Sequence, residues 1–242
     1  MCARIYFAGA GGAIGQQLLP RLLERGYTVL AISRSAERAE ALRRVGAEAE
    51  VVDVLDAGAV RDSLLRFRPH WVMHQLTDLP PGLDPALMPE AQLRNARLRR
   101  EGTANLVAAA REAGVQRLVA QSIAWAYAEG ALPYRESQPL DIHAEGARGV
   151  SVGAVAALEA SVLQAVPLEG IVLRYGRLYG PGTGCAEPDD LGLHVADAAE
   201  AALLALEWGA PGVYNIAGDE RQVSSALARL KLGWQPRHPR RA

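Results

Sequence analysis

The sequence predicts an α/β fold, a Rossmann-type doubly wound parallel sheet with a small C-terminal substrate-binding appendage. Two observations lead to this class. The chain opens on an apolar strand pattern, continues with a glycine-rich turn at residues 9–15, and then repeats its apolar positions at helical spacing. Strand-like and helix-like patterns then alternate until about residue 175, after which the chain becomes irregular and rich in Gly and Pro.

Short apolar runs predict the strands, and longer runs with apolar residues on one face predict the helices. The predicted strands are residues 5–8, 27–33, 49–54, 71–74, 117–121, 170–174 and 212–216. The predicted helices are residues 16–24, 36–44, 59–66, 90–113, 147–165, 195–207 and 223–230. Because strands and helices alternate, we expect a parallel sheet with helices on both faces and right-handed connections.

The change near residue 175, from alternating strand and helix patterns to an irregular stretch rich in Gly and Pro, defines the predicted domain organisation. We expect residues 1–175 to form an NAD(P)-binding Rossmann domain. Residues 176–242 form a reduced C-terminal substrate region, which contributes to the same domain and does not fold alone. A region this short favours a small substrate, an open cleft, or a substrate site completed by a second subunit.

Composition narrows the class of protein. The 242 residues include 26 basic and 27 acidic side chains, so nothing favours nucleic acid or a membrane as partner. The two cysteines, Cys2 and Cys185, predict neither a disulfide framework nor a metal site. The first strand follows Met1 too closely for a signal peptide, and we expect no membrane-spanning run. The prediction is a cytoplasmic protein with a small-molecule substrate, as a monomer or homodimer.

The glycine-rich turn is the strongest functional signal in the chain. Gly9, Gly12 and Gly15 are spaced GxxGxxG between a strand and a helix, where bare backbone can approach a pyrophosphate and the helix N-terminus can bind it. We assign Ala13 and Ile14 to the same cofactor site. A purely structural turn is the alternative.

The end of the second predicted strand indicates which dinucleotide is bound. An acidic residue there holds the ribose of NAD, whereas a basic residue accommodates the 2′-phosphate of NADP. This chain has Ser33, Arg34 and Ser35 in that place, which favours NADP over NAD. Asp53 and Val54, after the third strand, are placed to reach the adenine. An exposed arginine and a plain strand-end aspartate without these roles are the alternatives.

Motifs along the whole chain resemble those of one superfamily. The matching segments are residues 9–15, 53–56, 102–107, 117–122, 173–182, 194–199 and 232–236. In their order and content they resemble the extended short-chain dehydrogenase/reductases, the NAD-dependent sugar-nucleotide epimerases and dehydratases. The resemblance implies a dinucleotide cofactor and hydride transfer.

The catalytic pair that the resemblance implies is absent. These enzymes use a Tyr-x-x-x-Lys pair, in which the lysine lowers the pKa of the phenol so that it can exchange a proton near neutral pH. Matching the family's helical glutamate to Glu159 places Ser151 at the tyrosine position and Val155 at the lysine position. The chain's one lysine, Lys231, lies near the C-terminus.

Other residues in the segments that surround the nicotinamide remain candidates for catalysis. We predict Ser122, Tyr127 and His143 as catalytic residues, although His143 also fits an ordinary loop histidine. Arg174 fits either a substrate anion site or a structural role. The function that follows is an atypical NAD(P)-dependent oxidoreductase or epimerase. The alternative is a non-catalytic dinucleotide-binding redox sensor or regulatory module.

Overall fold

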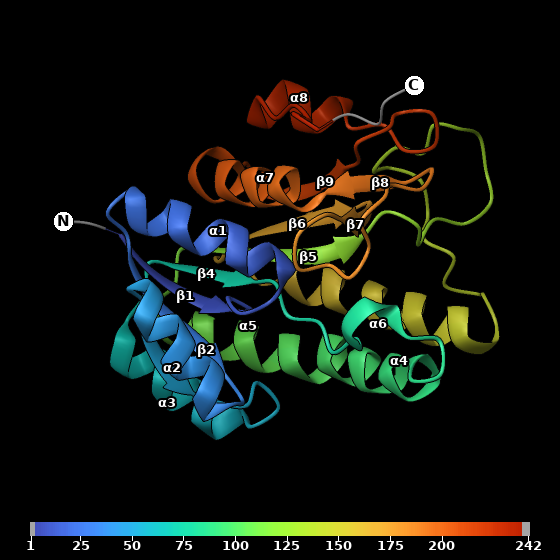
Figure 1. Cartoon of the computed structure of the whole chain (residues 1–242). Coiled ribbons are helices and arrows are strands. Elements are labelled where there is room, and N and C mark those ends of the chain that lie inside the picture. Colours follow the sequence, from blue (N-terminus) through green and yellow to red (C-terminus); the bar gives the residue numbers. More distant parts are fainter. Residues whose placement is uncertain (1–2, 239–242) are drawn as a thin grey trace.

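The computed structural model describes residues 3–238, which form one seven-stranded parallel sheet with helices on both faces (Figure 1). The strand order is β3-β2-β1-β4-β5-β6-β9. The strands are β1 Arg4–Ala8, β2 Thr28–Ser33, β3 Glu48–Val51, β4 Trp71–His74, β5 Arg117–Ile123, β6 Glu169–Tyr175 and β9 Gly212–Ile216. The predicted fold class is therefore confirmed. The last strand comes from the C-terminal region and completes the same sheet.

Helices cover the two faces of the sheet in separate sets. They are α1 Ala13–Glu24, α2 Ala36–Val45, α3 Ala57–Phe67, α4 Met88–Arg97, α5 Thr103–Glu112, α6 Gly146–Leu163, α7 Val195–Trp208 and α8 Ala226–Leu232. Alternation along β1 shows the division: Ile5 and Phe7 face the core with α1 and α7, whereas Tyr6 and Ala8 face the core with α3, α5 and α6. The central strands β1, β4, β5 and β6 are buried on both faces, as their apolar runs predict, whereas the edge strand β3 is partly exposed.

Two predicted elements differ from the structure. The single helix expected over residues 90–113 is interrupted by a π-helical turn, Leu98–Gly102, between α4 and α5. The third strand ends at Val51 instead of residue 54, because Asp53 Oδ1 accepts the Leu55 N–H and turns the chain. The irregular segment after β6 also contains a small two-stranded parallel sheet, β7 Arg177–Tyr179 with β8 Gly192–His194, which periodicity does not reveal.

The last connection of the sheet departs from uniform right-handed winding. Helix α1 connects β1 to β2, and α7 lies in the connection from β6 to β9. These two connections move in opposite directions along the strand order, yet α1 and α7 pack together on the same face of the sheet. The two connections therefore have opposite hands, and the prediction is wrong for one of them. The long segment with β7 and β8 precedes α7, so the twist of β6 does not dictate the face that α7 covers.

Among the described helices, α6 alone is long and apolar enough, by length and composition, to cross a membrane. The sequence analysis expected no run of this kind, so this helix departs from that expectation. Its contacts give another reason for this composition, because Leu158 and Val162 pack in the core beneath β6. Glu159 of the same helix turns inward to an arginine of β6.

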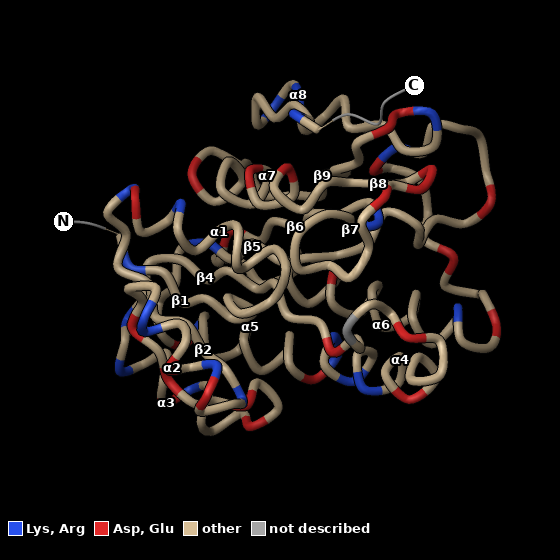
Figure 2. The backbone as a smooth tube through the Cα atoms, viewed as in Figure 1, with Lys and Arg blue, Asp and Glu red and all other residues tan. Residues whose placement is uncertain are grey.

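Charged residues are interspersed over the outer helices and loops, whereas the strands are mostly uncharged (Figure 2). Four charged side chains depart from this pattern because they are buried: Arg99, Glu159, Arg174 and Asp197. The strand order reverses between β1 and β4, and ligands of doubly wound sheets bind at such a reversal, outside the carboxyl edge.

Candidate cofactor and active site

The turn between β1 and α1 tolerates only glycine at two positions. Gly9 has φ +102°, and a Cβ on it would lie 2.5 Å from the backbone carbon of Gln75. A Cβ on Gly15 would lie 2.3 Å from the Ala10 carbonyl oxygen. These contacts hold the turn against the segment that follows β4, and the first turn of α1 against the turn itself.

The same turn leaves an open cradle at the start of α1. Gly11 and Gly12 are exposed, and a Cβ on Gly11 would meet nothing within 4 Å. Gly12 begins the helix without a side-chain cap, and the first turn, which includes Ala13 and Ile14, carries no acidic residue. Unpaired amides and the positive end of the helix dipole therefore face this space. The cradle fits the pyrophosphate of a dinucleotide.

At the end of β2, two of the three predicted cofactor residues have structural hydrogen bonds and the third is exposed. Ser33 Oγ accepts the Ser35 N–H at 3.2 Å, and Ser35 Oγ caps α2 by accepting the Arg38 N–H at 3.3 Å. Arg34 is 51% exposed and lies 3.5 Å from Asp78. A guanidinium so exposed and so loosely paired is free to bind a phosphate.

The segment after β3 approaches the helix that begins at residue 103. Asn105 Nδ2 donates to the Val54 carbonyl at 3.0 Å, and a Cβ on Gly102 would lie 2.9 Å from Val54 Cγ1. Asp53 uses Oδ1 to hold the Leu55 N–H and is otherwise exposed. The predicted adenine residues therefore lie on a loop fixed from both sides.

Two buried polar atoms lie at the carboxyl edge near the glycine turn. The Gln75 amide faces the Tyr175 hydroxyl, and neither Gln75 Oε1 nor that hydroxyl completes a hydrogen bond within the described chain. Burial raises the pKa of Tyr175 well above its usual range. Tyr175 is therefore not suited to exchange a proton at neutral pH.

Ser122 and Tyr127 meet in one buried network. Ser122 Oγ donates to Glu159 Oε1 at 2.6 Å, and Glu159 accepts from Arg174 Nε and Nη2 at 2.9 and 2.6 Å. Arg174 Nη1 donates to the Tyr127 hydroxyl at 2.9 Å, which in turn donates to Asn215 Oδ1 at 2.6 Å. Arg174 is thereby fully engaged with protein groups, which favours the structural role for it.

Burial affects the acidity of Tyr127. It raises the pKa of the phenol, and the nearby Arg174 offsets this only in part. The Tyr127 ring stacks on Tyr134 at 5.1 Å between centroids. His143 lies apart from this network, on the exposed loop before α6. A catalytic role for Ser122, Tyr127 or His143 stays a prediction.

The two positions of the missing catalytic pair have different surroundings. Val155 is fully buried in a small core with Ile123 and Val152. Ser151 Oγ accepts a hydrogen bond from Arg99 Nη1 at 3.4 Å. Arg99 belongs to the π-helical turn and is only 6% exposed. Sequence reasoning missed it, because it lies in an arginine-rich stretch typical of a solvated face.

Comparison with known proteins fits this geometry. A family model described as the NAD dependent epimerase/dehydratase family matches residues 5–191, which include the glycine turn, Ser122, Glu159 and Arg174. The chain belongs to this family. Among the family's solved structures, UDP-glucose 4-epimerase of Thermotoga maritima has a TM-score of 0.78 at 20% identity, over 97% of this chain and 94% of that chain. The Thermus thermophilus enzyme, solved with NAD, has 0.75 at 23%, with the same two coverages.

Two curated proteins are similar in sequence. A 3-diazoavenalumate denitrifying reductase of a Streptomyces species is 40% identical over 277 aligned positions, covering 97% of this chain and 89% of that protein. Cinnamoyl-CoA reductase 1 of rice is 36% identical over 118 residues, 46% of this chain and 31% of that protein. The first alignment is longer than this chain, so the relative carries additional residues inside the matched region.

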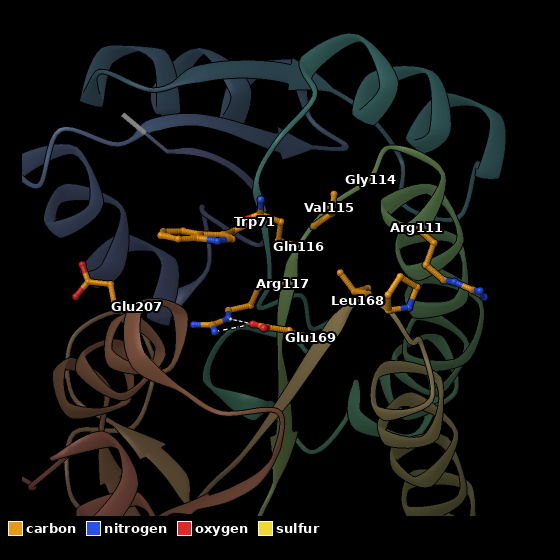
Figure 3. A pocket seen from close by; sticks show the side chains of 10 residues that line it. Trp71, Arg111, Gly114, Val115, Gln116, Arg117, Leu168, Glu169 and Glu207 are labelled. Atoms are coloured by element: carbon orange, nitrogen blue, oxygen red, sulfur yellow. Dashed lines mark hydrogen bonds and ion pairs between the residues drawn. The ribbon is translucent and has the colours of Figure 1, made fainter. Parts of the chain in front are cut away.

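Described residues of the chain line two cavities of interest. One of about 600 Å³ lies at the amino edge of the sheet, lined by Trp71, Arg117, Glu169 and Glu207 among others (Figure 3). In this cavity Arg117 Nη2 donates to Glu169 Oε2 at 2.6 Å, and Arg117 Nη1 donates to the Leu206 carbonyl. The glycine turn lies at the opposite edge, so this cavity has no part in the cofactor site. A second cavity, of about 250 Å³, lies beside Ser151.

Proposed function

We propose that this protein is a reductase that uses a nicotinamide dinucleotide, NADP in preference to NAD, to transfer hydride to a small acceptor. The observation that carries the proposal is 40% identity to a reductase over 97% of the chain. The glycine cradle supports binding of the dinucleotide, and Arg34 after β2 supports the choice of NADP. A bound reduced nicotinamide supplies the hydride.

The missing Tyr and Lys restrict the reaction. Reduction of a carbonyl requires a proton at the oxygen, and in this family a tyrosine provides it. Ser151 and Val155 stand in the matching positions, and the tyrosine hydroxyls of Tyr127 and Tyr175 are buried with raised pKa values. An acceptor that needs no proton from the protein therefore fits this site best.

A diazo group is such an acceptor. The name of the curated relative describes a reductase that removes nitrogen from a diazo compound. Addition of hydride to the terminal nitrogen of an arenediazonium gives an aryldiazene, in which a new N–H bond has formed. The C–N bond then breaks, N₂ leaves, and the N–H proton passes to the ring carbon. One hydride and one diazonium give one arene and one N₂, so atoms and charge balance.

The test is turnover with matched acceptors. NADPH is incubated with the protein and either an arenediazonium that carries a carboxylate side chain or the aldehyde of the same skeleton. We expect NADPH oxidation and an equal amount of N₂ with the diazonium, and none with the aldehyde. Gly15→Ala is the control for the uncatalysed reaction, because its Cβ would collide with the Ala10 carbonyl.

Two outcomes would contradict the proposal. Turnover of the aldehyde would show that another residue supplies the proton. Absence of turnover, together with different affinities for oxidised and reduced cofactor, would favour the redox sensor, since a sensor must bind the two forms differently.

A further inference from the structure

Arg99 is a buried cation without a counter-charge. Its side chain is on the π-helical turn Leu98–Gly102, and no ion pair within residues 3–238 includes it. Its hydrogen bond is the one from Nη1 to Ser151 Oγ at 3.4 Å. Burial lowers the pKa of Arg99 to about 10, so the guanidinium still carries its charge at neutral pH. Such a charge is costly to bury unless a binding partner compensates it.

The neighbours of Arg99 do not supply that compensation. His74 is fully buried and shares a hydrogen bond of 2.9 Å with Thr103 Oγ1. Burial, and secondarily the charge of Arg99, lower the pKa of His74 to about 4, so the imidazole is neutral. The other buried arginine, Arg174, has the Glu159 carboxylate at 2.6 Å. Within residues 3–238, one buried arginine is therefore paired with an acid and the other is not.

Ser151 connects Arg99 to the cavity of about 250 Å³. The cavity is lined by Gln92, Ile123, Trp125, Ala147, Arg148, Ser151 and Val152, none of them acidic. Arg148 is already neutralised, because its Nε donates to Asp141 at 2.6 Å and its two terminal nitrogens donate to backbone carbonyls. Ser151 Oγ accepts from Arg99, so its own O–H is available to donate to a ligand.

The position and size of the cavity point to one end of a substrate. Ile123 ends β5, so the cavity lies at the carboxyl edge of the sheet, as the glycine turn does. Its volume is below the roughly 300–1,000 Å³ of sites that hold a whole ligand. The π-helical turn that carries Arg99 is a feature often found at functional sites.

We infer that Arg99 and Ser151 form the binding site for a carboxylate of the substrate. The Ser151 hydroxyl donates to one carboxylate oxygen, and the buried guanidinium compensates the negative charge. This inference rests on the proposed function, because it identifies the substrate as a compact carboxylic acid whose other end accepts the hydride. It gives Ser151 a binding role at the position that the family resemblance assigns to the catalytic tyrosine.

The experiment compares an acid with its amide. Cinnamate and cinnamamide are titrated calorimetrically into the full chain saturated with NADP⁺. We expect the wild type to bind cinnamate at least about tenfold more tightly than cinnamamide, as a hydrogen bond to a charged group requires. Arg99→Met should abolish the preference. Arg100→Met is the matched control, since Arg100 is an exposed arginine of the same turn, and it should keep the preference.

Ser151→Ala keeps the inference testable if Arg99→Met does not fold. This small change at the cavity wall should weaken cinnamate binding by about three- to tenfold and cinnamamide binding by less, because a hydrogen bond to a neutral carbonyl contributes less than one to a carboxylate. Equal affinities for acid and amide in the wild type, or a preference that survives in both variants, would overturn the inference. Preference without diazonium turnover would overturn the proposed function alone, whereas turnover without preference would overturn only the carboxylate site.

Discussion

The guanidinium of Arg174 holds the carboxylate of Glu159 through two hydrogen bonds, at 2.9 and 2.6 Å, and both side chains are only 6% exposed. Arg174 comes from β6 and Glu159 from α6, so the pair joins the helix to the sheet. Ser122 of β5 and Tyr127 bind to the same pair from either side. This ion pair therefore organises the interior beneath the predicted active site.

Removing the charge of Glu159 should be strongly destabilising. Glu159→Gln leaves the Arg174 guanidinium buried without its counter-charge, and we expect a loss of about 3–5 kcal/mol in the free energy of unfolding. Denaturant unfolding monitored by tryptophan fluorescence measures this loss. The double variant Glu159→Leu with Arg174→Met removes both charges and should recover part of the stability. A single variant as stable as wild type would contradict a buried, charged pair.

Ser122→Ala tests whether Ser122 has a role besides its bond to Glu159. We expect a loss of about 1–2 kcal/mol in stability, because one hydrogen bond to a charged group is removed while Arg174 still holds the carboxylate. The predicted catalytic role requires, in addition, a fall in kcat. If kcat stays at the wild-type value with the diazonium substrate, the serine is structural.

The sequence predicts the fold well because apolar periodicity and glycine positions reflect local physical requirements. The seven strands of the main sheet occur where the runs predict them, apart from the early end of the third strand, and the turn at Gly9 and Gly15 has the close contacts that its spacing implies. The small sheet of β7 and β8 was missed, since strands of three residues carry no readable period. The hand of the last connection was missed because it depends on packing between α1 and α7.

The site is less predictable, because burial of a charge depends on tertiary contacts. Glu159 identifies the register of the family helix, but nothing local indicates that its partner is Arg174. In the sequence, nothing distinguishes Arg99 from the nearby exposed arginines Arg97 and Arg100. The π-helical turn that rotates Arg99 inward has no recognisable sequence pattern. The absence of the Tyr–Lys pair, in contrast, is readable directly from the sequence.

The glycine turn provides a steric prediction. Gly15→Ala places a Cβ 2.3 Å from the Ala10 carbonyl oxygen, so α1 must move away from the turn that precedes it. We expect loss of NADPH binding, measured by fluorescence titration, and a stability loss of several kcal/mol, measured by denaturant unfolding. Gly11→Ala is the control for stability, because its Cβ would meet nothing within 4 Å. Equal stability of the two variants would be inconsistent with this packing.

The proposed preference for NADP rests on Arg34. Arg34→Ala should weaken NADPH binding by roughly 1.5–3 kcal/mol, about ten- to a hundredfold, because a charge-assisted contact to the 2′-phosphate is lost. NADH lacks that phosphate and serves as the internal control, so its affinity should change by less than about twofold. Calorimetric titration of both cofactors measures the difference. Unchanged NADPH affinity would refute the assignment of NADP.

The burial of His74 predicts how stability depends on pH. Its pKa is lowered from 6.5 to about 4 by burial and by the charge of Arg99, so the folded protein holds the neutral imidazole. Below pH 6.5 the His74 imidazole takes up a proton in the unfolded chain, whereas in the folded chain it stays neutral until about pH 4. The stabilisation is therefore present above pH 6.5 and falls with pH through this window, by up to roughly 3 kcal/mol.

Substitution separates this contribution from those of the other titrating groups. His74→Gln removes the titration, so its free energy of unfolding should fall less between pH 6.5 and 4.5 than that of the wild type. His143→Gln is the matched control, because the same change is made at an exposed loop position. Its free energy of unfolding, measured by denaturant unfolding at each pH, should fall with pH as steeply as that of the wild type. If the free energy of unfolding of His74→Gln falls with pH as steeply as that of the control, His74 takes up its proton in the folded protein without a loss of stability.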